Sequence, residues 1–366
     1  MKKARFSGIE LLRIIMMIQI IFLHFCDKGG YTSIAKTLPF WHHGLYYFVW
    51  LLSRCPVYVF MMLTGYFLIK KEQDFSSIKE RIKKIYIPML FYSIAITGLG
   101  LVLGLWPLKD VNIPKVFTPF LSDSWYFLTG YIILIILSPF LNRLANNLTK
   151  KEYGILILIF TFILAIWTPL ANFAPFKSFI STFQIISNNA GKSLYDYIFM
   201  YLLGGYLALH VPSKDKLDFK YLLVFVGCGV AQIGLAYLFK GYRPIAGYND
   251  NLFAIIQAVC LVLFFREMKF SSKFINFIAT FTLPIYIIHE HYLLKWCFWD
   301  KLGLSKAFFE SYLYPLKIIG ICLGIFIACI LIELVRRLIF LACNKVWEYF
   351  KSHLGHHNVN KKLKKA

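Results

Sequence analysis

Three ionisable side chains lie in one apolar stretch near the start of the chain: Glu10, Arg13 and His24, within IELLRIIMMIQIIFLHF. Arg13 and His24 are 11 positions apart, which on an α-helix is three full turns plus about 20°. They therefore share one helix face, about 16 Å apart along the axis. Glu10 lies one turn before Arg13 and can pair with it. We expect this polar stripe to face the interior of a helix bundle, because a charged group in contact with lipid is costly.

The same residues also allow an interpretation without chemistry. The side chains of Glu10 and Arg13 would extend to one membrane surface, so that their charged ends lie in water. His24 would lie at the opposite membrane surface. Ionisable residues inside a membrane usually have a function, so three of them on one face favour a functional site. A histidine can serve as a general base near neutral pH, whereas a permanently charged arginine is suited to holding an anion.

Later apolar stretches carry polar residues at similar depths. Arg54 lies in the outer part of the second stretch, and His289 and Glu290 lie toward the outer end of the ninth. The histidines and arginines of these stretches suggest two different tasks, proton transfer and anion binding, at different depths.

A basic cluster directly precedes the third apolar stretch and comprises Arg81, Lys83 and Lys84. Such a cluster can hold phosphate groups. The excess of Lys and Arg that marks cytoplasmic loops gives the same pattern. Taken alone, the cluster supports both interpretations equally.

The elements that must position these residues are membrane spans. The chain has 366 residues, of which 59% are hydrophobic and 16% charged, a composition far more apolar than a soluble protein needs. Apolar stretches of about 20 residues, long enough to cross a bilayer, recur throughout. We predict an all-α integral membrane protein with about ten such spans. They cover about residues 8–25, 45–69, 85–106, 124–144, 153–171, 194–211, 221–239, 251–268, 274–294 and 312–340.

The distribution of basic residues predicts the orientation of these spans. With the N-terminus inside, 26 Lys and Arg residues fall on the inner side and 11 on the outer side, as expected for short cytoplasmic loops. Both termini are therefore predicted to be cytoplasmic. The net charge of +22 then reflects contact with anionic lipid at the bilayer surface. Nucleic acid is not an expected partner, because no soluble basic domain with exposed aromatic residues is present.

The segments between spans are too short for a separate soluble domain. We predict one membrane domain over residues 1–345 and a basic cytoplasmic tail over residues 346–366. The eight cysteines are scattered without a C-x-x-C pair, so neither a disulfide framework nor a metal site is expected.

Five segments resemble the acyltransferase-3 family of multi-pass membrane O-acyltransferases of bacterial envelope glycans. The most specific is the R-x10-H arrangement of Arg13 and His24, with an acidic residue three positions before the arginine. VFMMLTGYFL is similar to the family's F-x-x-S-G-Y-x-L, with Thr64 in place of serine. The remaining matches are ERIKKIYIP before the third span, SWYFLTGYIILIILSPFL in the fourth and TLPIYIIHEHYL in the ninth.

The resemblance implies transfer of an acyl group, usually acetyl, from a cytoplasmic acyl-CoA to a hydroxyl of a glycan at the outer face. His24 would be the catalytic residue, and Arg13 and Glu10 its partners in the motif. The residues expected near the acceptor or around the catalytic histidine are Arg54, Trp125, Tyr126, His289 and Glu290.

The basic cluster would bind the donor in this interpretation. Arg81 and Lys84 would take the place of the family's R-x-x-R, with Lys83 beside them. Lys84 departs from that pattern, since a lysine offers a point charge where an arginine offers a planar fork.

We therefore expect an O-acyltransferase of the cell (plasma) membrane. Acetyl-CoA would be its donor substrate, no cofactor would be bound permanently, and the acceptor would be an envelope or exported polysaccharide or its lipid-linked precursor. His24 would take a proton from the acceptor hydroxyl or would itself be acylated first; the sequence leaves both routes open. The alternatives from other classes are an exporter or flippase for a glycan or anionic small molecule, and a non-catalytic sensory membrane domain.

Overall fold

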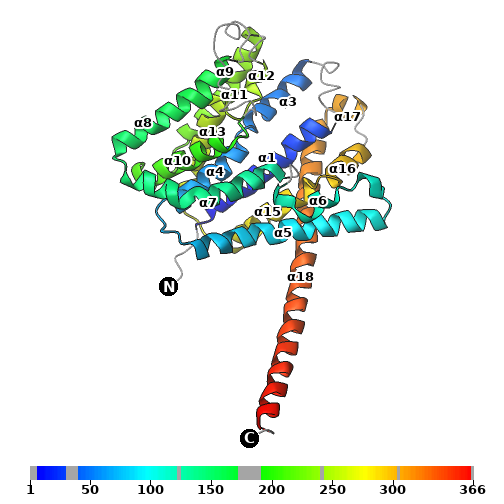
Figure 1. The fold of residues 1–366 in the computed structure, drawn as a ribbon. Coiled ribbons are helices and arrows are strands. Elements are labelled where there is room, and N and C mark those ends of the chain that lie inside the picture. The colour runs from blue at the N-terminus through cyan, green and yellow to red at the C-terminus, as the bar shows by residue number, and fades with distance from the viewer. Residues whose placement is uncertain are drawn as a thin grey trace.

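The computed structural model describes residues 6–29, 40–121, 125–171, 191–239, 243–302 and 306–363. Regular structure within these ranges is entirely helical, as predicted (Figure 1). The helices are α1 (Ser7–Lys28), α3 (Phe40–Leu52), α4 (Pro56–Leu68), α5 (Phe75–Val102), η2 (Leu108–Asp110), α6 (Ile113–Phe117), η3 (Pro119–Leu121), α7 (Tyr126–Asn147), α8 (Lys150–Phe160), η5 (Thr161–Trp167, a π-helix), α9 (Thr168–Ala171), α10 (Leu194–His210), α11 (Lys220–Leu238), α12 (Arg243–Ala246), α13 (Leu252–Arg266), α14 (Lys273–Ala279), α15 (Thr282–His289), α16 (Leu294–Leu302), α17 (Lys306–Glu310) and α18 (Tyr314–Leu363).

Seven segments among the described residues are helical, long and apolar enough to cross a membrane. The prediction of about ten spans is therefore supported in part. Each of the other three predicted spans coincides with a shorter helical segment: α10 with 17 residues, α13 with 15 residues, and α14 together with α15. Of these, α10 and α13 are largely buried, so they pack against protein along most of their length.

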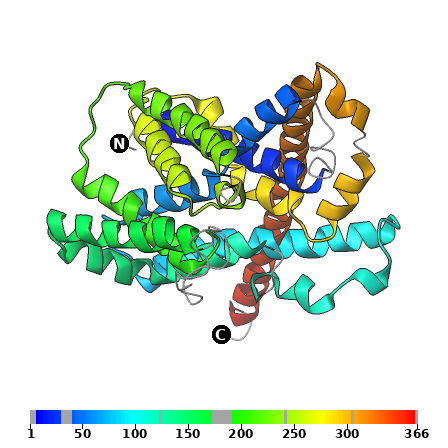
Figure 2. The same cartoon turned by 90° about the horizontal axis from the view of Figure 1, so that it is seen from above.

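The first helix occupies the centre of the bundle. It packs against α4, α13, α14, α15 and α18. Figure 2 shows α1 between a group formed by α8 to α13 and a second group formed by α16 to α18. Its first half contributes Leu12 and Met16 to one hydrophobic cluster, and its second half contributes Ile21 and Phe25 to another. Other helices therefore surround α1, and its polar stripe faces protein.

A break between α3 and α4 positions Arg54. The helix ends at Leu52, and α4 restarts with Pro56 at its first position, where the missing N–H of proline has no cost. The Ser53 hydroxyl donates a hydrogen bond to the Val49 carbonyl at 2.8 Å, which closes the end of α3. Arg54 thus lies in the interruption of an otherwise apolar span, Gly44–Leu68.

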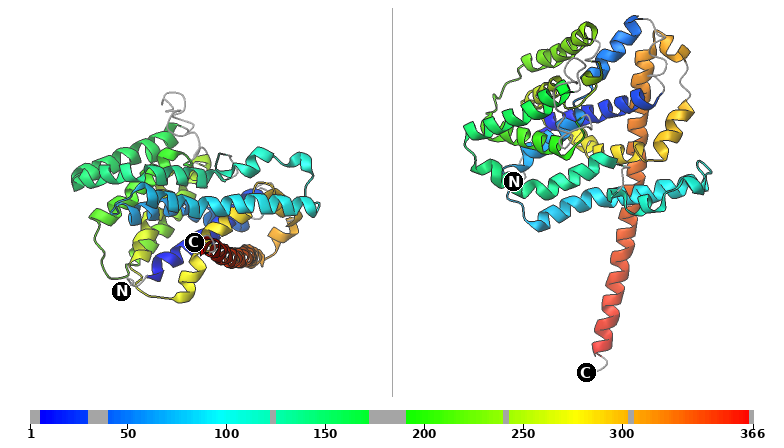
Figure 3. Two further views of the ribbon diagram at one scale, coloured as in Figure 1. Left: turned by 60° about the horizontal axis from the view of Figure 1, so that its bottom comes forward. Right: turned by 45° about the horizontal axis from the view of Figure 1, so that its top comes forward.

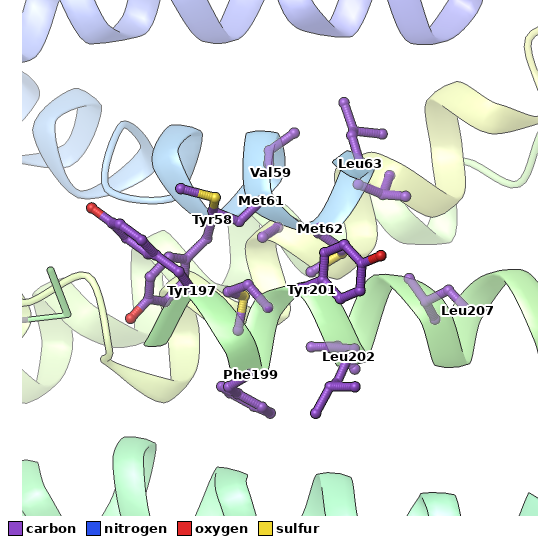
Figure 4. Packing of buried hydrophobic residues seen from close by; sticks show 14 of the residues in the cluster. Tyr58, Val59, Met61, Met62, Leu63, Tyr197, Phe199, Tyr201, Leu202 and Leu207 are labelled. Carbon is purple, nitrogen blue, oxygen red and sulfur yellow. The ribbon is translucent and has the colours of Figure 1, made fainter. Parts of the chain in front are cut away.

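Two glycines allow α4 and α10 to cross at very short distance. A Cβ added at Gly204 would lie 1.9 Å from the Met62 carbonyl oxygen, and one at Gly65 would lie 1.9 Å from the Tyr201 carbonyl oxygen. Figure 4 shows the apolar side chains that pack around this crossing. The glycine of the LTGY segment is therefore explained by backbone contact with α10.

Replacing Gly204 by alanine is expected to destabilise the fold, because the new methyl group would clash with backbone on α4. Overpacking of a close-packed core typically costs about 1–3 kcal/mol. The thermal unfolding midpoint in detergent should fall clearly. Gly234→Ala on α11 is the matched control, since its Cβ would meet nothing within 4 Å; an equal midpoint for both variants would refute the proposed contact.

The last helix continues far beyond the bundle. α18 has 50 residues, and its second half projects away from the other helices (Figures 1 and 3). The helix passes without interruption through the predicted boundary between residues 345 and 346. Residues 364–366 of the predicted basic tail lie outside the described residues.

Candidate active site

A cavity of about 420 Å³ lies between α1, α4, α5, α7 and α15, a volume within the range of small-molecule sites. Its cationic or imidazole lining residues are Arg13, His24, Arg54, Arg81, Lys84 and Lys192. The lining follows α1 from Arg13 to His24 and α4 from Val57 to Leu68. The cavity therefore runs along the polar stripe that the sequence predicts.

The stretch between the two polar ends is apolar. Met17 and Ile20 contribute to it from α1, and Phe60 and Leu63 contribute from α4. Thr64 also lines the cavity, and its hydroxyl donates a hydrogen bond to the Phe60 carbonyl of its own helix, at 2.8 Å. This arrangement suits a ligand with a charged end, a long uncharged arm and a reactive group at the far end.

His24 is held by two residues from the end of α15. Its Nδ1 lies 2.9 Å from His289 Nε2 and 3.1 Å from Glu290 Oε1. The side chains are 18% exposed for His24 and 8% exposed for Glu290. The structure therefore brings together three residues that the sequence nominates from two distant segments.

The contacts of these residues determine which nitrogen carries each proton. His289 Nδ1 lies 2.5 Å from the Ile285 carbonyl, which can only accept, so His289 Nδ1 is the donor. In a neutral imidazole the His289 Nε2 is then an acceptor, and His24 Nδ1 must donate to it. The Glu290 carboxylate imposes the same tautomer on His24. His24 Nε2 is thereby left with a lone pair that can take a proton.

Two lysines neutralise Glu290. The Lys28 ammonium forms an ion pair with Glu290 Oε1, and the Lys295 ammonium lies 3.8 Å from Oε2. One ligand atom from each of His24, His289 and Glu290 lies within 4.8 Å of the others, a spacing that can hold a metal ion. A metal ion there would be repelled by the ammonium groups of Lys28 and Lys295. Its binding would also break the hydrogen bond between His24 and His289. The arrangement therefore favours a hydrogen-bonded relay.

At the other end of the cavity, Arg13 is held by Glu10. Arg13 Nη1 donates to Glu10 Oε2 at 3.3 Å, and the Glu10 side chain is 8% exposed against 34% for Arg13. A buried carboxylate beside a partly exposed guanidinium fixes the guanidinium in place. Glu10 thus pairs with the guanidinium of Arg13, and Arg13 lines the cavity.

The basic cluster before the third span divides into two parts. Arg81 and Lys84 line the cavity. Lys83 lies outside it, where its ammonium pairs with Glu80 at 2.7 Å on the exposed side of α5. The helical spacing explains the division, because positions three apart share a face.

Trp125 and Tyr126 have different places although they are adjacent. The fully buried Trp125 donates from Nε1 to the Ile287 carbonyl at 3.1 Å, and its ring meets the His291 ring edge-on. It thereby braces the end of α15, next to His289. Tyr126 lines the cavity itself.

The sequence alone does not identify four of the residues at this site: Lys28, Lys295, Lys192 and Asn249. Lys28 lies four positions after His24, so helical spacing places both on one side of α1. Lys295 lies on α16, beyond the end of α15, and helical spacing offers no signal for it. Lys192 and Asn249 line the cavity from segments outside the long spans, and nothing in their local sequence places them there.

The fold and the site define a helical membrane protein with an internal cavity and a histidine relay. The model of the acyltransferase-3 family, described as an acyltransferase domain, matches residues 6–334. The chain therefore belongs to this acyltransferase family. Comparisons with curated proteins and with solved structures find no match.

Proposed function

We propose that this protein transfers an acyl group from a cytoplasmic acyl-CoA to a hydroxyl of an envelope or exported polysaccharide or its lipid-linked precursor. The acyl group that we propose is acetyl. The protein would act in the plasma membrane, with both termini in the cytoplasm. The observation that carries the proposal is that one cavity is lined both by Arg81 and Lys84 and by His24. The family match favours this function over an exporter, a flippase or a sensory domain.

The basic end of the cavity would bind the donor. Arg81 and Lys84 would hold the phosphates of acyl-CoA, with Arg13 beside them, because phosphate groups are bound best by charge-assisted hydrogen bonds. The uncharged pantetheine arm would lie along the apolar stretch between Met17 and Leu63. Its thioester would then reach His24 while the charged part of the donor stays at the membrane surface.

His24 would act as general base in one displacement. The acceptor hydroxyl oxygen attacks the thioester carbonyl carbon, its proton passes to His24 Nε2, and a new ester C–O bond forms. The C–S bond breaks, and His24 returns the proton to the departing thiolate, which leaves as CoA thiol. His289 and Glu290 keep His24 Nδ1 protonated throughout, which is the orienting role that a third group has in catalytic triads.

Removing the two cavity-lining charges is expected to weaken donor binding selectively. The variant Arg81→Gln/Lys84→Gln should raise KM for acetyl-CoA by about tenfold or more, since a hydrogen bond to a charged group contributes about 1.5–3 kcal/mol. CoA release by the purified protein with extracted glycan as acceptor measures this. Lys83→Gln is the matched control, because Lys83 bears the same charge but faces Glu80 outside the cavity.

Two results would contradict the proposal. A rise in KM for Lys83→Gln equal to that of the double variant would mean that only the general charge of the loop matters. The absence of acetyl-CoA consumption by folded wild-type protein, with glycan present, would contradict the acyltransferase function itself.

A further inference from the structure

Two cations at the His24 end of the cavity have no task in the reaction described above. Arg54 and Lys192 both line the cavity there. The donor's phosphates would lie at the opposite end, beside Arg13, about 16 Å away along α1. These two cations therefore face the part of the cavity that the acceptor would enter.

Arg54 is a guanidinium with unused hydrogen-bonding capacity. It lies over the Trp50 ring, with its Cζ 4.7 Å from the ring centroid. Its Nε is buried and has no hydrogen-bond partner among the described residues. A buried N–H of a charged group is costly to leave unpaired, and the planar fork of arginine matches the oxygens of carboxylate and phosphate.

Lys192 presents a second positive charge to the same space. Its ammonium lies 5.4 Å from the centroid of the Tyr126 ring. Burial lowers the pKa of Lys192, and the positive charge of Arg54 lowers it further. The two cations therefore repel each other, and an anion between them would relieve that repulsion.

The acidic side chains nearby leave these cations without a full counterion. Asp27 and Asp250 act electrostatically on Arg54, but neither forms an ion pair with it within the described ranges. Asp27 and Glu290 also act electrostatically on Lys192. Asp27 is thus shared between the two cations, and Glu290 is already paired with Lys28. Among the described residues that line the cavity, Asp27 is the sole acid, against five Arg and Lys residues.

We propose that Arg54 and Lys192 bind an anionic group of the acceptor, a carboxylate or a phosphate, and so place a nearby hydroxyl at His24. The inference rests on the proposed function in assigning this anion to the acceptor. It narrows the acceptor to acidic glycans, in which the charge is a sugar carboxylate, or to sugars linked to phosphate, as in a lipid-linked precursor.

Binding of small anions to the purified full-length protein tests this site without catalysis. The probes are glucuronate, glucose 1-phosphate and neutral glucose, and the shift of the thermal unfolding midpoint with probe concentration gives Kd. The measurement is made on Arg81→Gln/Lys84→Gln protein, which removes two of the three cations at the donor end of the cavity. At least one anion should stabilise the protein where glucose does not.

Variants then locate the binding. Arg54→Gln and Lys192→Gln should each weaken anion binding by about tenfold or more, whereas Lys109→Gln, an exposed lysine outside the cavity, should not. Arg54→Lys keeps the charge and loses the fork, and an intermediate Kd is expected. Preference for glucuronate points to an acidic sugar, and preference for glucose 1-phosphate points to a phosphate-linked one.

The proposal is overturned if glucose stabilises the protein as much as both anions do, or if Lys192→Gln binds them like its parent. Because no acyl donor is present, these results are independent of the acyltransferase function. Anion binding that depends on Arg54 and Lys192 would stand even if His24 proved dispensable for ester formation.

Discussion

Replacing His24 by alanine is expected to abolish ester formation while leaving the protein in the membrane. The variant removes the one lone pair that the relay leaves available, and general base catalysis contributes about 10²–10⁴-fold. The measurement is the amount of alkali-labile acetate on extracted envelope glycans, normalised to the level of the protein in the membrane. His24 is only partly buried, so the loss of its side chain should cost less stability than activity.

A histidine outside the cavity provides the control for this variant. His210 lies at the end of α10, where its ring contacts Tyr153 and Tyr206. His210→Ala should keep esters near the wild-type level. Persistence of esters in His24→Ala cells that contain the protein would remove His24 from the mechanism.

The Glu290→Gln variant should lose both activity and stability. The substitution keeps the shape of the side chain but removes the charge that faces Lys28, Lys295 and His24. Breaking one side of a buried ion pair typically costs about 3–5 kcal/mol. An uncharged amide also offers His24 Nδ1 a weaker acceptor, so we expect kcat to fall by about a hundredfold, the lower end of what a general base contributes.

Two measurements separate these effects. The thermal unfolding midpoint reports the lost ion pair, and kcat at saturating acetyl-CoA reports the orientation of His24. Glu348→Gln is the control, since Glu348 is an exposed acid on the projecting part of α18. If Glu290→Gln lowered the midpoint with kcat unchanged, Glu290 would be a structural residue without influence on His24.

The polar stripe of α1 could be predicted from the sequence because it depends on one helix. The separation of Arg13 and His24 places them on one face by geometry alone, and the cavity follows that face. The Glu10 to Arg13 pair is equally local. The helical class and most spans follow from the length of the apolar stretches in the same way.

The sequence identifies His24, His289 and Glu290 as candidate site residues, but it does not show that their side chains contact one another. His24 and His289 are 265 positions apart, and their contact depends on how α15 packs beside α1. The tautomer assignment depends on the Ile285 carbonyl, a backbone group that has no sequence signature. Trp125 is similar, since its role is a hydrogen bond to the backbone of α15.

The number of spans was harder to predict for a physical reason. Hydropathy reports burial in apolar surroundings, and it does not distinguish lipid from protein. α10 is apolar because it is packed on α4 across Gly65 and Gly204, and α13 is apolar because it is buried. Their composition fits both a buried helix and a short membrane span, so the described helices support seven spans and the further three stay a prediction.

We expect an acyl group to pass from acyl-CoA at the Arg81 end of the cavity to a hydroxyl at His24. Membrane vesicles with the cytoplasmic face outward test it most directly, when labelled acetyl-CoA is supplied outside and label is counted in alkali-labile esters of the glycan fraction. We predict label with the wild-type protein and none with His24→Ala. Equal labelling with both proteins, or no labelling by wild-type vesicles that contain folded protein and glycan, would contradict this account.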